Sequence, residues 1–182
     1  MQNMRKYEKK RPYKGFTLVE LIIVVVILGI AAAIAVPMLS SAADMQVRSA
    51  ANRIAADLDY AKGLAITHQS RYSVVFDVSG ESYEIQDENG DPIDNPVNPG
   101  STFVVDFSAD SRLSQVNIVT ADFDSDSSDA ITFDYLGSPY HGTSTLAADA
   151  LNSGTITLQA DNFTLYVKTE PVTGYVTIED IP

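Results

Sequence analysis

The longest run of apolar positions in the chain begins at Phe16, directly after a segment rich in lysine and arginine. Between Phe16 and Ala43, Glu20 is the only residue with a charged side chain. As an α-helix these residues would extend about 42 Å at 1.5 Å per residue, whereas a hydrocarbon core is about 30 Å thick. The pattern predicts a single membrane-spanning helix over residues 16–37, since no second apolar run of comparable length follows.

Beyond Pro37 the apolar positions recur every three or four residues, which is the period of a helix with one buried face. These positions are Val47, Ala50, Ala51, Ile54, Leu58, Ala61, Leu64 and Ala65. We therefore expect an amphipathic helix over residues 38–70 that ends at about His68 and packs its apolar stripe on a β-sheet. His68 is expected at the surface of the last turn, where it complements the helix dipole, rather than as a metal ligand.

After the helix the pattern changes to the alternation of apolar and polar residues that is typical of strands, with enrichment in β-branched and aromatic residues. Strands are predicted at 72–78, 82–86, 102–107, 115–120, 131–135, 154–159, 163–168 and 174–179. Residues 87–101 and 136–153 interrupt the pattern and are predicted to be loops. The fold class is thus α+β, with a long N-terminal helix packed on a C-terminal antiparallel β-sheet head at 71–182.

The charge is divided unevenly along the chain. Residues 1–15 contain six basic residues and one acidic residue, whereas the other 167 residues have a net charge of −17. Positive charge before a membrane span favours a cytoplasmic N-terminus, so we expect the acidic head on the opposite side of the membrane. Cysteine is absent and only two histidines occur, which excludes disulfides and thiol chemistry and disfavours a histidine-rich metal site.

Glu20 distinguishes three interpretations of the apolar segment. A plain membrane anchor does not require the acid. An ordinary secretory signal peptide, cleaved after the Ala31–Ala33 or the Ala33–Ala35 tripeptide, does not require it either. A carboxylate in a membrane span is costly and normally has a partner, and the span itself contains no basic residue. Under the third interpretation, the Glu20 carboxylate therefore has a partner on another molecule.

The segment Gly15-Phe16-Thr17-Leu18-Val19-Glu20-Leu21-Ile22 resembles the class III signal of type IV pilins and type II secretion pseudopilins. The resemblance implies that a membrane prepilin peptidase removes the basic leader 1–15 by cutting between Gly15 and Phe16, and then methylates the new Phe16 amine. It also implies that Glu20 pairs with the Phe16 amine of a neighbouring subunit during filament assembly. Pro37 corresponds to the proline that kinks many pilin helices.

The head resembles the GspH/FimT-like minor pseudopilins. The residues that carry this resemblance are the helix end at 61–66, the strand at 73–77, the segments 131–133 and 136–139, and the C-terminal segments 154–158 and 173–176. Residues 87–130 are not covered, and the absence of cysteine departs from pilins that close a C-terminal disulfide loop.

This resemblance implies a non-enzymatic minor subunit of a type II secretion pseudopilus or a type IV pilus in the bacterial inner membrane, with an extracytoplasmic head. The partners it implies are the prepilin peptidase, other pilin or pseudopilin subunits, the inner-membrane assembly platform and membrane lipid. Two alternatives remain open at this point. One is a major type IV pilin that builds an adhesive or motility fibre, and the other is an exported β-domain binding module cleaved by ordinary signal peptidase near Ile34 or Val36.

Other chemistry receives little support from the sequence. Acidic groups at Asp122, Asp124, Asp126 and Asp129, and around Asp87, lack the glycine and glutamate of a calcium loop, so we interpret them as solvated loops. His141 has serines nearby but no orienting acid in a catalytic motif. Within residues 72–182 only Arg112 and Lys168 are basic, so nucleic-acid binding by the head is not expected. We expect no cofactor, no metal and no enzymatic activity.

Overall fold

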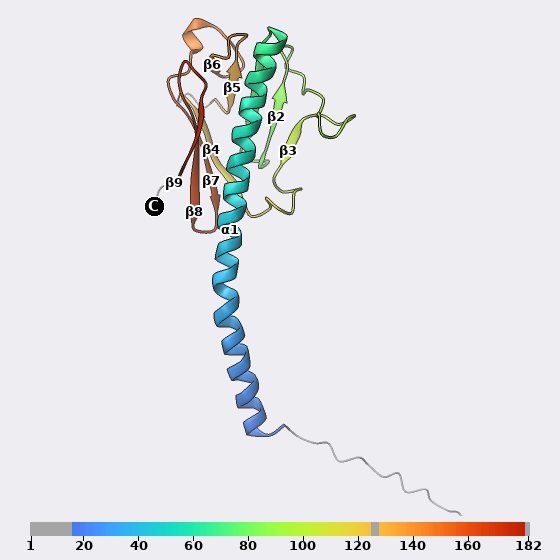
Figure 1. Cartoon of the computed structure of the whole chain (residues 1–182), viewed down its shortest axis with the longest axis vertical. Coiled ribbons are helices and arrows are strands. Elements are labelled where there is room, and N and C mark those ends of the chain that lie inside the picture. Colours follow the sequence, from blue (N-terminus) through green and yellow to red (C-terminus); the bar gives the residue numbers. More distant parts are fainter. Residues whose placement is uncertain (1–15, 125–127, 181–182) are drawn as a thin grey trace, which may run out of the picture. The chain divides into compact units, whose positions relative to one another are not determined.

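The computed structural model describes residues 16–124 and 128–180, and for residues 34–41 it describes the backbone alone. The elements are α1 (Leu18–His68), β1 (Tyr72–Asp77), β2 (Ser82–Gln86), β3 (Val104–Asp106), β4 (Asn117–Phe123), β5 (Ala130–Phe133), β6 (Pro139–His141), η1 (Ala147–Asp149), β7 (Gly154–Ala160), β8 (Phe163–Thr169) and β9 (Val176–Asp180) (Figure 1). The chain divides between Leu39 and Ser40 into two compact units, which we describe separately. The second unit, from Ser40 onward, is called the head below.

Within the head, α1 buries one face along its length. Its buried apolar side chains are those of Ala43, Val47, Ala50, Ala51, Ile54, Leu58, Ala61 and Ala65. They follow the predicted spacing, except that Ala43 extends the stripe and Leu64 is only partly buried. The helix ends because Gln69 has a φ of +55° and turns the chain out of the helical path. The amide of Ser70 then donates to the carbonyl of Ala65 at 3.3 Å, which satisfies a carbonyl that the helix leaves unpaired.

The strands of the head form two antiparallel sheets. One sheet has five strands in the order β3-β2-β1-β5-β6, and the other has four in the order β4-β7-β8-β9. Along β2 the buried residues alternate with partly exposed ones, so the strand turns one side toward the core. Strand β1 buries Ser73 as well as Val74, and the Ser73 hydroxyl forms a hydrogen bond with that of Thr132 in β5. The predicted α+β fold with an antiparallel β head is confirmed, and its strands divide into two sheets that share one core with α1.

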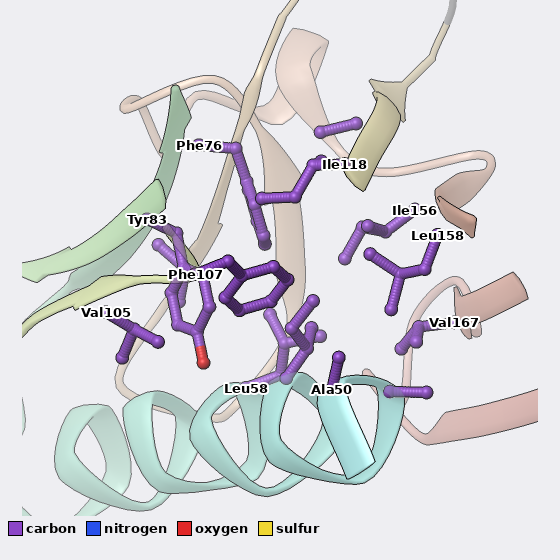
Figure 2. Packing of buried hydrophobic residues seen from close by; sticks show 14 of the residues in the cluster. Ala50, Leu58, Phe76, Tyr83, Val105, Phe107, Ile118, Ile156, Leu158 and Val167 are labelled. Carbon is purple, nitrogen blue, oxygen red and sulfur yellow. The ribbon is translucent and has the colours of Figure 1, made fainter. Parts of the chain in front are cut away.

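The core lies between α1 and both sheets. Figure 2 shows Ala50 and Leu58 of α1 directed toward side chains from each sheet and from the loop after β3. Tyr83 and Phe107 meet edge to face, with ring centroids 6.1 Å apart and an interplanar angle of 88°. Alanines on the helix let its backbone approach the sheets closely, while the aromatic rings fill the wider space beside them. One continuous core thereby unites elements that are far apart in the sequence.

A polar network interrupts this core at Asp57, whose side chain is 12% exposed. The buried Tyr83 hydroxyl donates to the Asp57 carboxylate at 2.6 Å, and Arg53 Nε donates to the same oxygen at 2.8 Å. Burial raises the pKa of the Tyr83 hydroxyl well above its ordinary value, and the nearby carboxylate raises it further. The hydroxyl therefore stays protonated and serves as the donor that the buried carboxylate needs.

Each of the eight predicted strands has a counterpart in the structure, and four of them, β1, β2, β7 and β8, have the predicted bounds within one residue. The structure shortens the strand predicted at 102–107 to 104–106 and moves the one predicted at 115–120 to 117–123. The region 136–153, which we predicted to be a loop, contains β6 and the short helix η1. The pattern did not indicate β6 because it is three residues long and starts with Pro139, which is tolerated at the first position of an edge strand.

Aspartates hold several turns of the head by accepting backbone hydrogen bonds. Asp87 accepts from the amides of Asn89 and Asp91, and Asp106 accepts from those of Ser108 and Ala109. Hydrogen bonds to a carboxylate favour its ionised form, so these turns lower the pKa of the carboxyls involved. The pKa is lowered from the ordinary 3.8 at Asp77 and Asp106, mainly by serine hydroxyls and then by backbone amides. The pKa is also lowered at Asp110, mainly by the Arg112 side chain, and at Asp87, mainly by backbone amides.

These lowered pKa values predict that the head loses stability in acid. A carboxyl whose pKa is lower in the folded state adds stability above its unfolded pKa, and this stability is lost as the pH falls through the folded pKa. We therefore expect the thermal unfolding midpoint to be constant from pH 7 to about 5 and to fall below about pH 4. Differential scanning calorimetry of the full chain in detergent measures this dependence.

The matched control replaces Asp77, Asp87, Asp106 and Asp110 by asparagine, which keeps an acceptor oxygen for each turn but does not titrate. The fall of the midpoint below pH 4 should be smaller in this variant than in the wild type. An equal fall in both proteins would show that other groups cause the loss of stability in acid.

Candidate functional site

The N-terminal unit presents an apolar helix surface with no cover. From Phe16 to Ala33 every described side chain is exposed, and each large apolar one is at least 47% exposed. A helix that is apolar on all sides is stable only when lipid or protein surrounds it. This surface is thus the first candidate for an interaction site.

The helix begins with a capping arrangement that includes the predicted assembly residue. Thr17 precedes the first helical residue, and its hydroxyl accepts a hydrogen bond from the Glu20 amide at 3.2 Å. Glu20 lies in the first turn, where a negative charge interacts favourably with the helix dipole. Over the described residues, the Glu20 carboxylate has no hydrogen-bond or ion-pair partner.

Thr17 is a residue that our sequence analysis did not single out. The signal was present, because a threonine followed three positions later by glutamate, just before an apolar run, is the sequence pattern of a capping box. The same carboxylate that we assigned to assembly thus stands at the third helical position, where it also favours helix initiation.

The other predicted site residues are placed only in part. Gly15 and the basic leader lie outside the described residues, so the predicted cleavage site is described on one side alone, at Phe16. Phe16 itself is 81% exposed and precedes the helix. The backbone of α1 is helical at Pro37, but its side chain lies outside the described residues, and the kink stays a prediction.

A search of the described residues for a helix both long and apolar enough to cross a membrane finds none.

The basic side chains of the head are already engaged within the chain. Arg48 pairs with Asp44 at 2.8 Å and with Asp180 at 2.7 Å. Lys62 donates to the carbonyl of Thr173 at 2.6 Å. The remaining four bind acceptors at 2.6–2.9 Å: Arg53 at Asp57, Arg71 at the Glu88 carbonyl, Arg112 at Asp110 and Lys168 at Glu179. Arg112 and Lys168, the two cations considered for nucleic acid, are therefore both paired.

The acidic loops serve as turn anchors where the structure describes them. Asp124 accepts hydrogen bonds from the amides of Asn152 and Ser153, which ties the start of its loop to the segment before β7. Asp126 lies outside the described residues. Among the residues with a described placement, no group of three or more histidines, cysteines or acids is arranged to hold a metal ion.

The two histidines take peripheral positions. His68 ends α1 as predicted, and its Nδ1 lies 2.7 Å from the Tyr72 hydroxyl. His141 is the last residue of the edge strand β6.

Two sequence families match the chain. Residues 10–36 match the prokaryotic N-terminal methylation motif, and residues 50–171 match the family described as type II transport protein GspH. The second match covers most of the head and includes the region 87–130 that our own sequence comparison left uncovered. No curated protein matches the sequence at a significant level.

Solved structures resemble the chain in fold. The minor pseudopilin EpsH from the type 2 secretion system of Vibrio cholerae is 10% identical, with a TM-score of 0.51 over 74% of this chain and 97% of that one. The type IV minor pilin FimU of Pseudomonas aeruginosa is 15% identical, with a TM-score of 0.44 over 75% of this chain and 88% of that one. The likeness to EpsH shows that the two proteins share a fold, in which an N-terminal helix packs on a β-rich head.

Proposed function

Because this chain belongs to the GspH family of type II transport proteins, we propose that it is a minor structural subunit of a type II secretion pseudopilus or a type IV pilus. The observation that carries the proposal is the combination of a GspH-type head with an N-terminal methylation motif on a single chain. Family and fold are those of a structural subunit, and we assign the chain no catalytic role.

Processing is the first step of the proposed function. A prepilin peptidase would cut between Gly15 and Phe16 and methylate the new amine, and the methylation motif spans this bond. Removal of the leader leaves Phe16 one residue before the capping threonine, so the new amine lies beside the first turn of the helix. Gly15 suits the subsite because it has no side chain and lets the backbone approach the peptidase.

The exposed apolar helix surface then has two environments in turn. Before assembly, residues 16–37 would span the inner membrane, with the leader side in the cytoplasm and the head outside it. During assembly the same surface would leave lipid and pack against other pilin-like subunits in the filament core, guided by the inner-membrane assembly platform. Both environments cover apolar side chains that the isolated helix exposes.

Glu20 would provide the contact that is specific to assembly. A carboxylate moved into an apolar filament core needs a partner, and the positive Phe16 amine of a neighbouring subunit supplies one. The absence of a described partner for Glu20 within its own chain is consistent with this pairing. Pro37 would let the helix bend where its membrane part gives way to the part that packs on the head.

The mass of the mature protein tests the processing step. We expect the chain purified from membranes to start at N-methylated Phe16, because the peptidase that recognises the motif performs both reactions. Intact-mass spectrometry and sequencing of the N-terminal peptide measure this. Replacement of Gly15 by leucine should leave the leader attached, since a side chain at that position blocks the close approach of the backbone.

The same measurement separates the alternatives. A chain that starts near Ile34 or Val36 would mean ordinary signal-peptidase cleavage and an exported binding module, and the filament proposal would then fail. A chain that retains its leader in the presence of the peptidase would contradict it as well. A major pilin differs from a minor one in abundance, because its chain would dominate preparations of sheared filaments.

A further inference from the structure

Five large apolar side chains are exposed together at the end of the head where α1 ends. They are Ile66, Tyr135, Leu136, Val172 and Tyr175, each between 43% and 80% exposed, and we call them the distal cluster. Figure 1 shows the end of α1, the turn between β5 and β6 and the turn between β8 and β9 at this same end of the head.

Close contacts hold the three segments together. A Cβ atom added to Gly137 would lie 3.0 Å from Cδ1 of Ile66, so the β5–β6 turn touches the helix. A Cβ atom on Gly174 would lie 3.1 Å from the Gly137 carbonyl oxygen, so the β8–β9 turn touches the β5–β6 turn. Lys62 donates to the Thr173 carbonyl and fastens the same turn to α1. The distal cluster is thus one surface built on three segments that contact one another.

The β8–β9 turn exposes an apolar side chain on a residue with an unfavourable backbone conformation. Val172 has a φ of +66°, a left-handed conformation that is unfavourable for a β-branched residue, and it is 80% exposed. The strain is maintained by the hydrogen bonds that close the turn, from Gly174 to the Glu170 carbonyl and from Glu170 to the Tyr175 carbonyl. Strained residues of this kind cluster at functional sites such as ligand clamps and switch regions.

The surroundings of the distal cluster are acidic. Glu170 is exposed at the start of the turn that carries Val172. Beside Tyr135 a cleft of about 400 Å³ is lined by Glu88, Asp134 and Arg71, and Arg71 already donates to the Glu88 carbonyl. The nearest cation on the other side, Lys62, is bound to backbone carbonyls. Asp134 is buried and its carboxylate holds the β5–β6 turn, so a partner of this surface meets the exposed carboxylates of Glu88 and Glu170 beside an apolar centre.

The charge of the whole head disfavours a second copy as that partner. Residues 40–182 contain 22 acidic and six basic residues, a net charge of −16, and each of the six basic side chains is engaged within the chain. Two such heads in contact would bring surfaces of the same net charge within the screening length of about 8–10 Å of each other, and the few cations present would offset only a small part of that repulsion. The same argument disfavours anionic lipid and nucleic acid.

We propose that the distal cluster docks on the head of a different pilin-like subunit that surrounds an apolar patch with basic side chains. The inference rests on the proposed function, since it takes the partner from the same filament. Apolar contact at the centre would supply affinity, and opposite charges at the rim would select the partner and exclude a second copy.

Photo-crosslinking tests this assignment. Benzoylphenylalanine is placed at Leu136 in the full chain, in cells that carry the whole assembly machinery, and the crosslinked polypeptides are identified by mass spectrometry. The control position is Val97, which is 88% exposed but lies in the 87–101 loop outside the distal cluster. We expect Leu136 to crosslink one different pilin-like subunit at a site rich in lysine or arginine, and Val97 not to crosslink that subunit.

A matched pair of variants tests the role of charge. Glu170→Gln should lower the yield of the Leu136 adduct by roughly fivefold through loss of one rim charge. Asp161→Asn removes one charge at the opposite end of β8 and should leave the yield unchanged. An adduct with a second copy of this chain, no adduct at Leu136, or equal effects of the two variants would overturn the assignment.

The proposed function and the proposed docking surface are tested by different measurements, so either can be contradicted without the other. The presence of the wild-type chain in sheared filaments, or its absence, tests the proposed function. The identity of the protein crosslinked to Leu136 is determined in whole cells, so this result does not depend on the sheared-filament preparation. A specific adduct with a basic pilin-like subunit would support the docking surface even if the chain proved absent from filaments.

Discussion

Replacement of Glu20 by alanine is expected to leave the chain inserted in the membrane but to remove it from filaments. In the proposed filament core, the Phe16 amine of the neighbouring subunit would then be buried without its counter-charge. Breaking a buried ion pair by removing one partner costs about 3–5 kcal/mol, which corresponds to a loss of incorporation of more than about 100-fold. Immunoblots of the membrane fraction and of sheared filaments measure the two quantities.

Two control variants separate pairing from helix initiation. Glu20→Gln keeps the length of the side chain but removes its charge, and incorporation should remain low. Thr17→Val removes the hydroxyl that caps the helix and should cost only about 1 kcal/mol, so incorporation should fall much less. Normal incorporation of Glu20→Ala, with the chain present in the membrane, would contradict the intersubunit charge pair.

Replacement of Asp57 by alanine is expected to lower the free energy of unfolding of the head by about 2–4 kcal/mol. The change leaves the buried Tyr83 hydroxyl without its acceptor and Arg53 without its counter-ion. The estimate lies below that for a fully buried pair because the Arg53 side chain is 43% exposed and regains solvent. Urea denaturation of the full chain in detergent, followed by circular dichroism, measures the change.

Asp59 provides the matched control on the same helix. It is exposed and has no described hydrogen bond or ion pair, so Asp59→Ala should change the free energy of unfolding by less than about 0.5 kcal/mol. Tyr83→Phe should destabilise the head less than Asp57→Ala, because Asp57 keeps its bond to Arg53. Equal effects of Asp57→Ala and Asp59→Ala would show that the polar network does not stabilise the head.

Local regularity explains which elements the sequence predicted well. The helical spacing from Val47 to Ala65 indicated the buried face of α1, because each of these positions lies on the same side of a helix whatever it packs against. The strands β7 and β8 were predicted within one residue since their alternation is uninterrupted on both sides of a short turn. Family membership was indicated by the segment around Gly15 and by the head, and the family matches confirm it.

Elements whose ends depend on the geometry of the adjoining turn were predicted less well. Strand β5 ends at Phe133 instead of continuing to Tyr135, because the Asp134 carboxylate accepts hydrogen bonds from the amides of Leu136 and Ser138 and holds a turn there. Strand β9 begins later than predicted because Gly174 adopts a φ of +57° at the preceding turn. The alternation of apolar and polar residues contains no information on which amide an aspartate will bind.

The sequence by itself determined the order of the helix and most strands, the apolar helix surface that precedes the head, and the family to which the chain belongs. These features depend on short-range spacing and on a contiguous motif, which a linear pattern records. The tertiary structure alone decided that the strands divide into two sheets, that every described cation of the head is engaged, and that Ile66, Leu136 and Val172 lie on one surface. Those properties arise from contacts between segments up to 132 residues apart, whose energies exist only once the chain has folded.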